Sequence, residues 1–269
     1  MVSVMTVIAC VVTMLVSLVL PVALLIVFAV KNKRQGLVPA WLLGASGFFV
    51  TQILIRIPAL AILQEQSWFV AFTQNRAFVY AFSLAFTAGL FELAGRLVVA
   101  KLIGHDLNFK RSLAAGLGHG GIEAMFLIGM TYVNNLIYIL MINSGSFDVL
   151  LTQAAAAGVD ISQLELIREQ LVAASPALFL LAGFERILAM IAHVAMSVLV
   201  CYGVANRKKG ICILMCLGIH TFIDLTPGIT LVLPQNMAYV VIYAILIAVA
   251  VVSVLILKRI YRTWKEVPL

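Results

Sequence analysis

The sequence predicts an all-α, polytopic membrane protein: a transmembrane helical bundle with about seven spans. Apolar residues make up 64% of the chain and charged residues only 11%, whereas a soluble domain carries about 25% charged residues. The mean hydropathy is +1.13. The apolar runs approach or exceed the roughly 20 residues that cross a bilayer as a helix. We place the spans at 4–30, 37–63, 77–101, 112–142, 176–204, 211–226 and 233–257.

The net charge of +7 is concentrated in a few connections. Thirteen of the eighteen Lys and Arg residues fall within 31–34, 101–111, 207–209 and 258–265. Basic residues favour the cytoplasmic side of a membrane. We therefore predict a multi-pass protein of the cell membrane, with its N-terminus outside and its C-terminus in the cytoplasm. Membrane lipids are the expected partners, and the charge pattern gives no reason to expect nucleic acid.

One integral membrane domain is expected over 1–269, and no cleavable leader is expected because the first residues lack a basic start. The connection 143–175 is its only sizeable polar region. Ser162 and Glu165 have the spacing of a capping box before an apolar periodic run. We expect an amphipathic helix on the outer surface, either resting on the headgroups or serving as a lid. The four cysteines lie in apolar stretches, which predicts buried thiols.

Ten ionisable side chains lie inside the predicted spans, which is more than a purely structural bundle should carry, because each is costly to insert. Several occur as pairs spaced i, i+4, so both members share one helix face. The ten are Arg56, Glu92, Arg96, His119, Glu123, Glu185, Arg186, His193, His220 and Asp224. We interpret Arg56 as a snorkelling residue or an ion-pair partner. The alternative for Glu92 and Arg96 is a buried ion pair that joins helices.

Depth brings most of these residues to one level of the membrane. At about 1.5 Å per residue, six of them lie roughly 10–20 Å from the predicted cytoplasmic ends of 77–101, 112–142, 176–204 and 211–226. These six are Glu92, His119, Glu123, His193, His220 and Asp224. We therefore predict one polar cluster in the cytoplasmic half. The glycines of GLGHGGIEA (116–124) are expected to allow close helix packing there.

Histidines together with carboxylates favour a transition metal, most plausibly Zn²⁺ with a position left open for water. A nearby glutamate would be the general base of metal-assisted hydrolysis. Arg96 and Arg186 would orient carboxylates or hold developing negative charge. A single membrane histidine is more often a helix–helix contact, but three at one depth favour ligands. The predicted ligands are His119, His193 and His220.

Four motifs resemble those of the YhfC-type intramembrane metalloproteases, relatives of PrsW and of the CAAX-protease and bacteriocin-processing group. They are FELAGR (91–96), GLGHGGIEA (116–124), a Glu-Arg pair separated from His193 by six residues (185–193), and HTFID (220–224). The resemblance implies that Glu92 is the first-motif acid, partnered by Arg96, and that His193 and His220 are the later histidines. It implies that Asp224 stabilises the oxyanion or completes the site.

The chain departs from that group at two positions. Phe91 precedes Glu92 where relatives often have paired glutamates, and His119 stands where the PrsW type has a glutamate. The sequence therefore leaves two candidates for the general base, Glu92 and Glu123.

We expect an intramembrane zinc endopeptidase that hydrolyses a peptide bond near the cytoplasmic half of the bilayer. Its substrate would be a membrane-embedded or membrane-proximal peptide or protein. The catalytic residues would come from Glu92, Glu123, Arg96, Arg186 and Asp224. Two alternatives are a proton- or cation-coupled transporter, since buried charges also form ion paths, and a non-catalytic scaffold or immunity protein.

Overall fold

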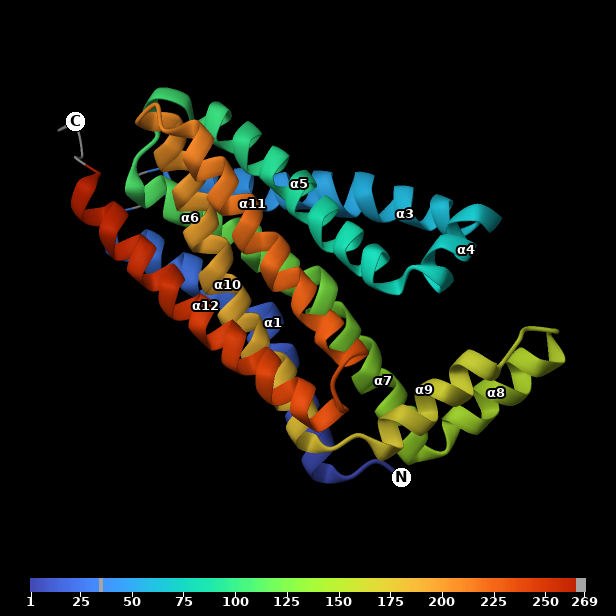
Figure 1. Cartoon of the computed structure of the whole chain (residues 1–269). Coiled ribbons are helices and arrows are strands. Elements are labelled where there is room, and N and C mark those ends of the chain that lie inside the picture. The colour runs from blue at the N-terminus through green and yellow to red at the C-terminus, as the bar shows by residue number, and fades with distance from the viewer. Residues whose placement is uncertain (34–35, 265–269) are drawn as a thin grey trace. The chain divides into compact units, whose positions relative to one another are not determined.

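The computed structural model describes residues 1–33 and 36–264, and within these ranges the chain is helical, with no strand (Figure 1). Seven helical segments are long and apolar enough to cross a membrane. They are Val4–Lys31, Leu37–Gln64, Ala77–Asp106, Phe109–Ser144, Pro176–Ala205, Lys209–Leu231 and Gln235–Thr263. The predicted all-α, seven-span, multi-pass fold is therefore confirmed, and the predicted spans overlap the observed ones one for one.

Several spans are built from more than one helical piece. The elements are α1 (Val4–Lys31), α2 (Leu37–Phe48), the π-helical turn η1 (Phe49–Arg56), α3 (Ile57–Gln64), α4 (Ser67–Asn75), α5 (Ala77–Ile103), the 3₁₀ turn η2 (Gly104–Asp106), α6 (Phe109–Glu123), the π-helical turn η3 (Ala124–Gly129), α7 (Met130–Ser144), α8 (Ser146–Ala156), α9 (Ser162–Ala173), α10 (Pro176–Ala205), α11 (Lys209–Leu225), the 3₁₀ turn η4 (Thr226–Leu231) and α12 (Gln235–Thr263).

The chain divides into two compact units. Unit 1 comprises Met1–Pro21 and Ala124–Ile187, and unit 2 comprises Val22–Glu123 and Leu188–Leu269. That the chain is one integral membrane domain stays a prediction. The predicted polar cluster falls within unit 2.

Unit 1 contains the polar connection, which forms two helices, α8 and α9, rather than one. Arg168 donates to the Asp148 carboxylate at 2.7 Å and joins them. The expected capping box is wrong: α9 begins with Ser162 itself as a helical residue, and its N-cap makes no side-chain hydrogen bond. Instead the Ser162 N–H donates to Asp160 at 2.9 Å, which holds the pKa of that carboxyl below its usual value. The placement of this hairpin on the outer surface stays a prediction.

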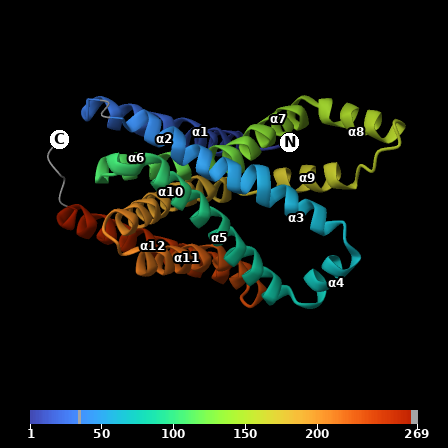
Figure 2. The ribbon, with the colours of Figure 1, turned by 90° about the horizontal axis from the view of Figure 1, so that it is seen from above.

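In unit 2, α2 runs along α6, as the view from above shows (Figure 2). Glycine makes this approach possible. A Cβ added at Gly118 would lie 2.0 Å from the carbonyl oxygen of Trp41, and one added at Gly44 would lie 1.9 Å from that of Ala115. Any side chain there would collide with backbone, so the two helices pack at the closest distance that glycine permits.

Two other glycines of the same stretch, Gly116 and Gly120, face α10. A Cβ at Gly116 would lie 2.7 Å from the Val194 Cα, and one at Gly120 would lie 2.9 Å from the His193 Cβ. The predicted role in close packing is confirmed for Gly116, Gly118 and Gly120, with α2 on one side of α6 and α10 on another. The predicted burial of all four cysteine thiols is confirmed as well.

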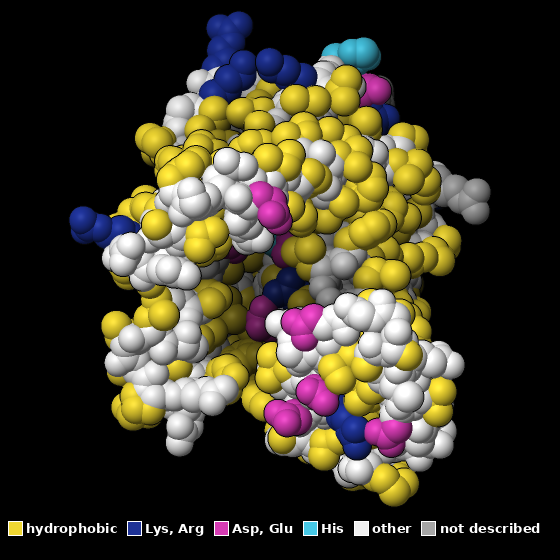
Figure 3. Space-filling model, turned by 90° about the vertical axis from the view of Figure 1, so that its right-hand side faces the viewer, with side chains coloured by type: hydrophobic (Ala, Val, Ile, Leu, Met, Phe, Trp, Pro, Cys, Tyr) yellow, Lys and Arg dark blue, Asp and Glu magenta, His cyan; other side chains and the backbone are white. Residues whose placement is uncertain are grey.

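Hydrophobic side chains dominate the outside of the molecule, as expected for helices that face lipid. Leu102, Leu214 and Val240 are each more than 60% exposed. Figure 3 shows one face covered mainly by hydrophobic side chains, with a group of Lys and Arg side chains at its upper end. This distribution agrees with apolar flanks between charged ends, and which end faces the cytoplasm stays a prediction.

The glycine contacts lead to a prediction about stability. Gly118→Ala is expected to lower the free energy of unfolding by about 1–3 kcal/mol, because the added methyl must push α2 away from α6. Gly218→Ala is the matched control, since nothing lies within 4 Å of its added Cβ. Chemical unfolding in detergent would measure both. Equal stability of the two variants would contradict the close packing of α2 on α6.

Candidate functional site

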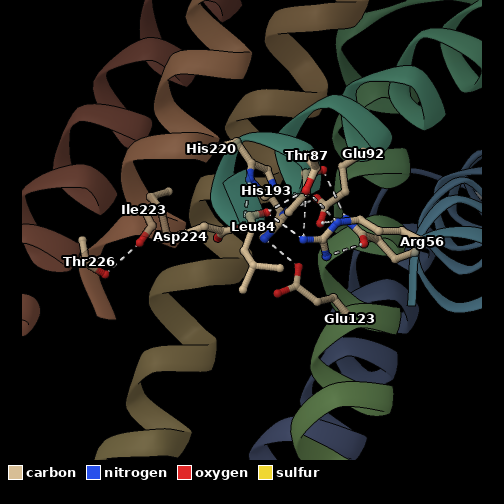
Figure 4. A network of polar contacts seen from close by, with 12 residues as sticks. Arg56, Leu84, Thr87, Glu92, Glu123, His193, His220, Ile223, Asp224 and Thr226 are labelled. Atoms are coloured by element: carbon tan, nitrogen blue, oxygen red, sulfur yellow. Dashed lines mark hydrogen bonds and ion pairs between the residues drawn. The ribbon is translucent and has the colours of Figure 1, made fainter. Parts of the chain in front are cut away.

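Glu92, on α5, is the centre of the polar cluster (Figure 4). Its carboxylate is only 5% exposed. Its Oε2 atom is 2.9 Å from His119 Nε2 and 2.7 Å from His220 Nε2. Arg96 Nη2 donates to the same oxygen at 3.1 Å, and the Gln52 amide donates to Oε1 at 3.0 Å. A buried carboxylate is therefore satisfied by four donors that come from η1, α5, α6 and α11.

His193, on α10, links this centre to a second carboxylate. Its Nδ1 lies 2.7 Å from Arg96 Nη2 and 3.6 Å from Glu92 Oε2. Its Nε2 lies 2.6 Å from Glu123 Oε2. A guanidinium can only donate, so Nδ1 must be the acceptor, and a neutral imidazole then carries its proton on Nε2. Arg96 therefore sets the tautomer of His193, and the protonated Nε2 lies next to the Glu123 carboxylate.

The edge of the cluster is more exposed than its centre. The Glu123 side chain is 12% exposed and that of Asp224 is 35% exposed, against 3% for His220. Asp224 Oδ2 lies 3.3 Å from His220 Nδ1 on the same face of α11. The cluster thus passes from a buried centre at Glu92 to a partly open rim that carries two further carboxylates.

Arg56 also reaches this cluster, and its interpretation as a snorkelling residue or an ion-pair partner stays a prediction. Its guanidinium donates to the Leu84 carbonyl at 2.7 Å, to the Gln52 side chain at 3.3 Å and to Thr87 Oγ1 at 3.3 Å. Figure 4 shows it directed toward the cluster. Hydrogen bonds to Leu84 and Thr87 of α5 hold this last residue of η1 in place.

Three residues contribute donor atoms that could hold a metal ion. One atom each from Glu92, His119 and His193 lies within 4.8 Å of the others, and all three residues are buried. Two imidazole nitrogens and a carboxylate oxygen form a donor set that suits Zn²⁺. This group contains Glu92 where the sequence suggested His220, because the Glu92 carboxylate lies between the imidazoles. The residues present therefore fit a metal ion.

The structure brings together seven of the eight predicted site residues in unit 2. They are Glu92, Arg96, His119, Glu123, His193, His220 and Asp224. The eighth, Arg186, contacts its neighbour Glu185, and both belong to unit 1. The catalytic role of Arg186 stays a prediction.

Sequence reasoning missed Gln52, which is 3% exposed and binds both Glu92 and the Ala88 carbonyl. Only ionisable side chains within the spans were considered as candidates, and the Gln52 amide is uncharged. Its spacing from Arg56 was nevertheless a usable signal, because the two are separated by i, i+4, as are Glu92 and Arg96. We add Gln52 to the site as the residue that holds the second oxygen of Glu92.

A family model described as YhfC intramembrane metalloprotease matches residues 16–255. The chain belongs to this family. It is 27% identical over 248 residues to the "Uncharacterized membrane protein YhfC" of Bacillus subtilis (strain 168), a match that covers 90% of this chain and 93% of the relative. No solved structure matches the chain. The resemblance carried by the four motifs is thereby confirmed at the level of the YhfC family, and its name supports a metal-dependent protease.

The contacts of Glu92 predict a specific stability effect. Gln52→Leu removes the only described side-chain donor to Glu92 Oε1 and is expected to lower the free energy of unfolding by about 1–3 kcal/mol, since the buried carboxylate loses a partner. Gln64→Leu makes the same change at an exposed position of α3 and is expected to have little effect. Equilibrium unfolding of both variants in detergent tests this. A Gln52 variant as stable as the control would mean that the hydrogen bond contributes nothing.

Proposed function

We propose that this chain is an intramembrane metal-dependent endopeptidase, with Zn²⁺ as the metal. The observation that carries the proposal is the buried donor set of Glu92, His119 and His193 beside the partly exposed carboxylate of Glu123. A group of metal ligands next to a partly exposed carboxylate is an arrangement that suits metal-assisted hydrolysis. The family to which the chain belongs supports the same reaction class.

Glu92, His119 and His193 would hold the ion, and His220 lies close enough to Glu92 to support or complete the set. When bound, zinc supplies a Lewis acid that polarises a carbonyl and makes a coordinated water nucleophilic near neutral pH. Each imidazole must offer an unprotonated nitrogen for this, so zinc affinity is expected to fall as the pH is lowered.

Glu123 is the better candidate for the general base. Both oxygens of Glu92 already accept hydrogen bonds, from Arg96 and the histidines on one side and from Gln52 on the other. Glu123 is the more exposed of the two glutamates. It would take the proton of the attacking water and pass it to the amine that leaves.

The remaining polar residues would position these groups. Arg96 holds the Glu92 carboxylate and the Nδ1 atom of His193 at once. Asp224 lies beside His220 Nδ1, so it would orient that ring toward the centre. A carboxylate cannot itself stabilise an oxyanion, and we therefore assign to Asp224 the orientation of His220.

The substrate would be a membrane-embedded or membrane-proximal peptide segment, cut near the cytoplasmic half of the bilayer. The support is the location of the cluster within apolar spans and the basic connections that predict which side is cytoplasmic. In this orientation the N-terminus is outside and the C-terminus is in the cytoplasm.

Zinc content is the first test. The purified wild-type protein is expected to bind one equivalent of zinc, measured by elemental analysis after dialysis against limiting zinc. His119→Ala and His193→Ala are expected to lose it, because each removes a ligand, whereas His105→Ala is the control because His105 is solvent-exposed. A wild-type protein that never binds zinc would exclude the zinc assignment and favour a transporter or a scaffold.

Glu123→Gln separates catalysis from metal binding. This variant is expected to retain zinc while its cleavage rate falls by at least about 100-fold, since a general base contributes roughly 10²–10⁴-fold. New N-termini in membranes that contain the wild-type protein would be compared with those in membranes that contain the variant. Equal cleavage by Glu123→Gln would remove Glu123 as the base and leave Glu92.

A further inference from the structure

A small cavity in unit 2 is lined by two residues of the cluster, Arg96 and His119. It offers about 10 Å³ to the centre of a water-sized molecule. Its lining residues come from α2, α5, α6 and α10 and are Gly44, Arg96, Val99, Ala115, His119, Ser197 and Cys201. That volume is close to the minimum for one water molecule.

Three of the lining residues present polar atoms that have no protein hydrogen-bond partner within 1–33 and 36–264. They are Nε and Nη1 of Arg96, Nδ1 of His119 and Oγ of Ser197. The residues are only 2%, 1% and 4% exposed, so bulk solvent does not reach these atoms. Buried polar groups are nearly always satisfied, and each one left without a partner costs about 1–3 kcal/mol. Four such atoms around one cavity therefore indicate a bound partner.

We propose that this cavity binds one ordered water molecule, which joins Arg96, His119 and Ser197. Its oxygen accepts from the Arg96 guanidinium, which can only donate. Its hydrogens are donated to His119 Nδ1 and to Ser197 Oγ. Water is the ligand that fits, because it both accepts and donates, and because the cavity has no room for a larger molecule.

The chemistry of His119 determines why water fits better than an anion. His119 Nε2 faces Glu92 Oε2 at 2.9 Å. An ionised carboxylate only accepts, so Nε2 carries the proton and Nδ1 has a lone pair directed away from Glu92. A chloride ion could accept from Arg96 but would repel that lone pair. A water molecule donates to it.

The water gives Ser197 a positioning role in the site. Histidines that bind metals usually have their second ring nitrogen held by an outer partner, which fixes the orientation and the tautomer of the ring. Here the water, anchored by Ser197 and Arg96, would be that partner for His119. It can reverse its hydrogen bond and accept from Nδ1 when Nε2 becomes a ligand. This last step depends on the proposed function, whereas the water itself does not.

The water is tested directly in the metal-free wild-type protein. A high-resolution crystal structure from a lipidic phase, with bromide in place of chloride, is expected to show one ordered peak within hydrogen-bonding distance of Arg96, His119 Nδ1 and Ser197 Oγ. That peak is expected to have no anomalous bromide signal. A bromide signal there, or a cavity without density, would overturn the proposal.

Substitution of Ser197 tests its positioning role in solution. The chain has four histidines, so ¹⁵N-histidine labelling can follow the Nδ1 resonance of His119 in the metal-free protein. Ser197→Ala is expected to shift this resonance, and Ser197→Thr, which retains the hydroxyl, is expected to restore it. Val99→Ala is the matched control, because it enlarges the same cavity but removes no polar atom. An unshifted Ser197→Ala resonance, or an equal shift in Val99→Ala, would contradict the role.

Zinc affinity tests whether Ser197 also influences metal binding. Ser197→Ala is expected to weaken zinc binding on the order of 10-fold, as for other outer partners of ligating histidines, and Val99→Ala is expected to leave it unchanged. Unchanged affinity in Ser197→Ala would overturn the positioning role. A wild-type protein that binds no zinc would count against the proposed function alone. The crystal structure and the histidine resonance test for the bound water in the metal-free protein.

Discussion

The structure of unit 2 depends on the burial of one carboxylate. Glu92 is nearly inaccessible within a set of apolar helices, where an unpaired charge would cost several kcal/mol. Its two oxygens therefore require donors from several directions, and no single helix can supply them. Residues on η1, α6 and α11 join Arg96 of its own helix to do so. The carboxylate thereby fixes which faces of four segments point inward.

Close helix packing is the condition that makes this arrangement possible. A donor must come within about 3 Å of the oxygen it binds, and ordinary side chains would hold the helices too far apart. Gly116, Gly118 and Gly120 remove that obstacle on α6, on the sides facing α2 and α10. The same closeness leaves a cavity of only about one water behind Arg96 and His119, so packing defines both the centre and the space beside it.

Exposure increases across the cluster from Glu92 to Glu123 and Asp224. Glu92 and His119 are buried and hydrogen-bonded to each other, whereas Glu123 and Asp224 are partly exposed. A buried, fully bonded group keeps its position but has little capacity to exchange protons with a substrate. A partly exposed group retains that capacity.

The sequence alone determined the spans and the existence of the cluster. An apolar run of about 20 residues has one favourable environment, and the helical rise converts position in the chain into depth. It did not determine which atoms meet, because rotation about each helix axis and the π-helical turn at Phe49–Arg56 depend on packing. Only the tertiary structure placed Glu92 among the histidines, added Gln52, and brought Arg96, His119 and Ser197 to the lining of one cavity.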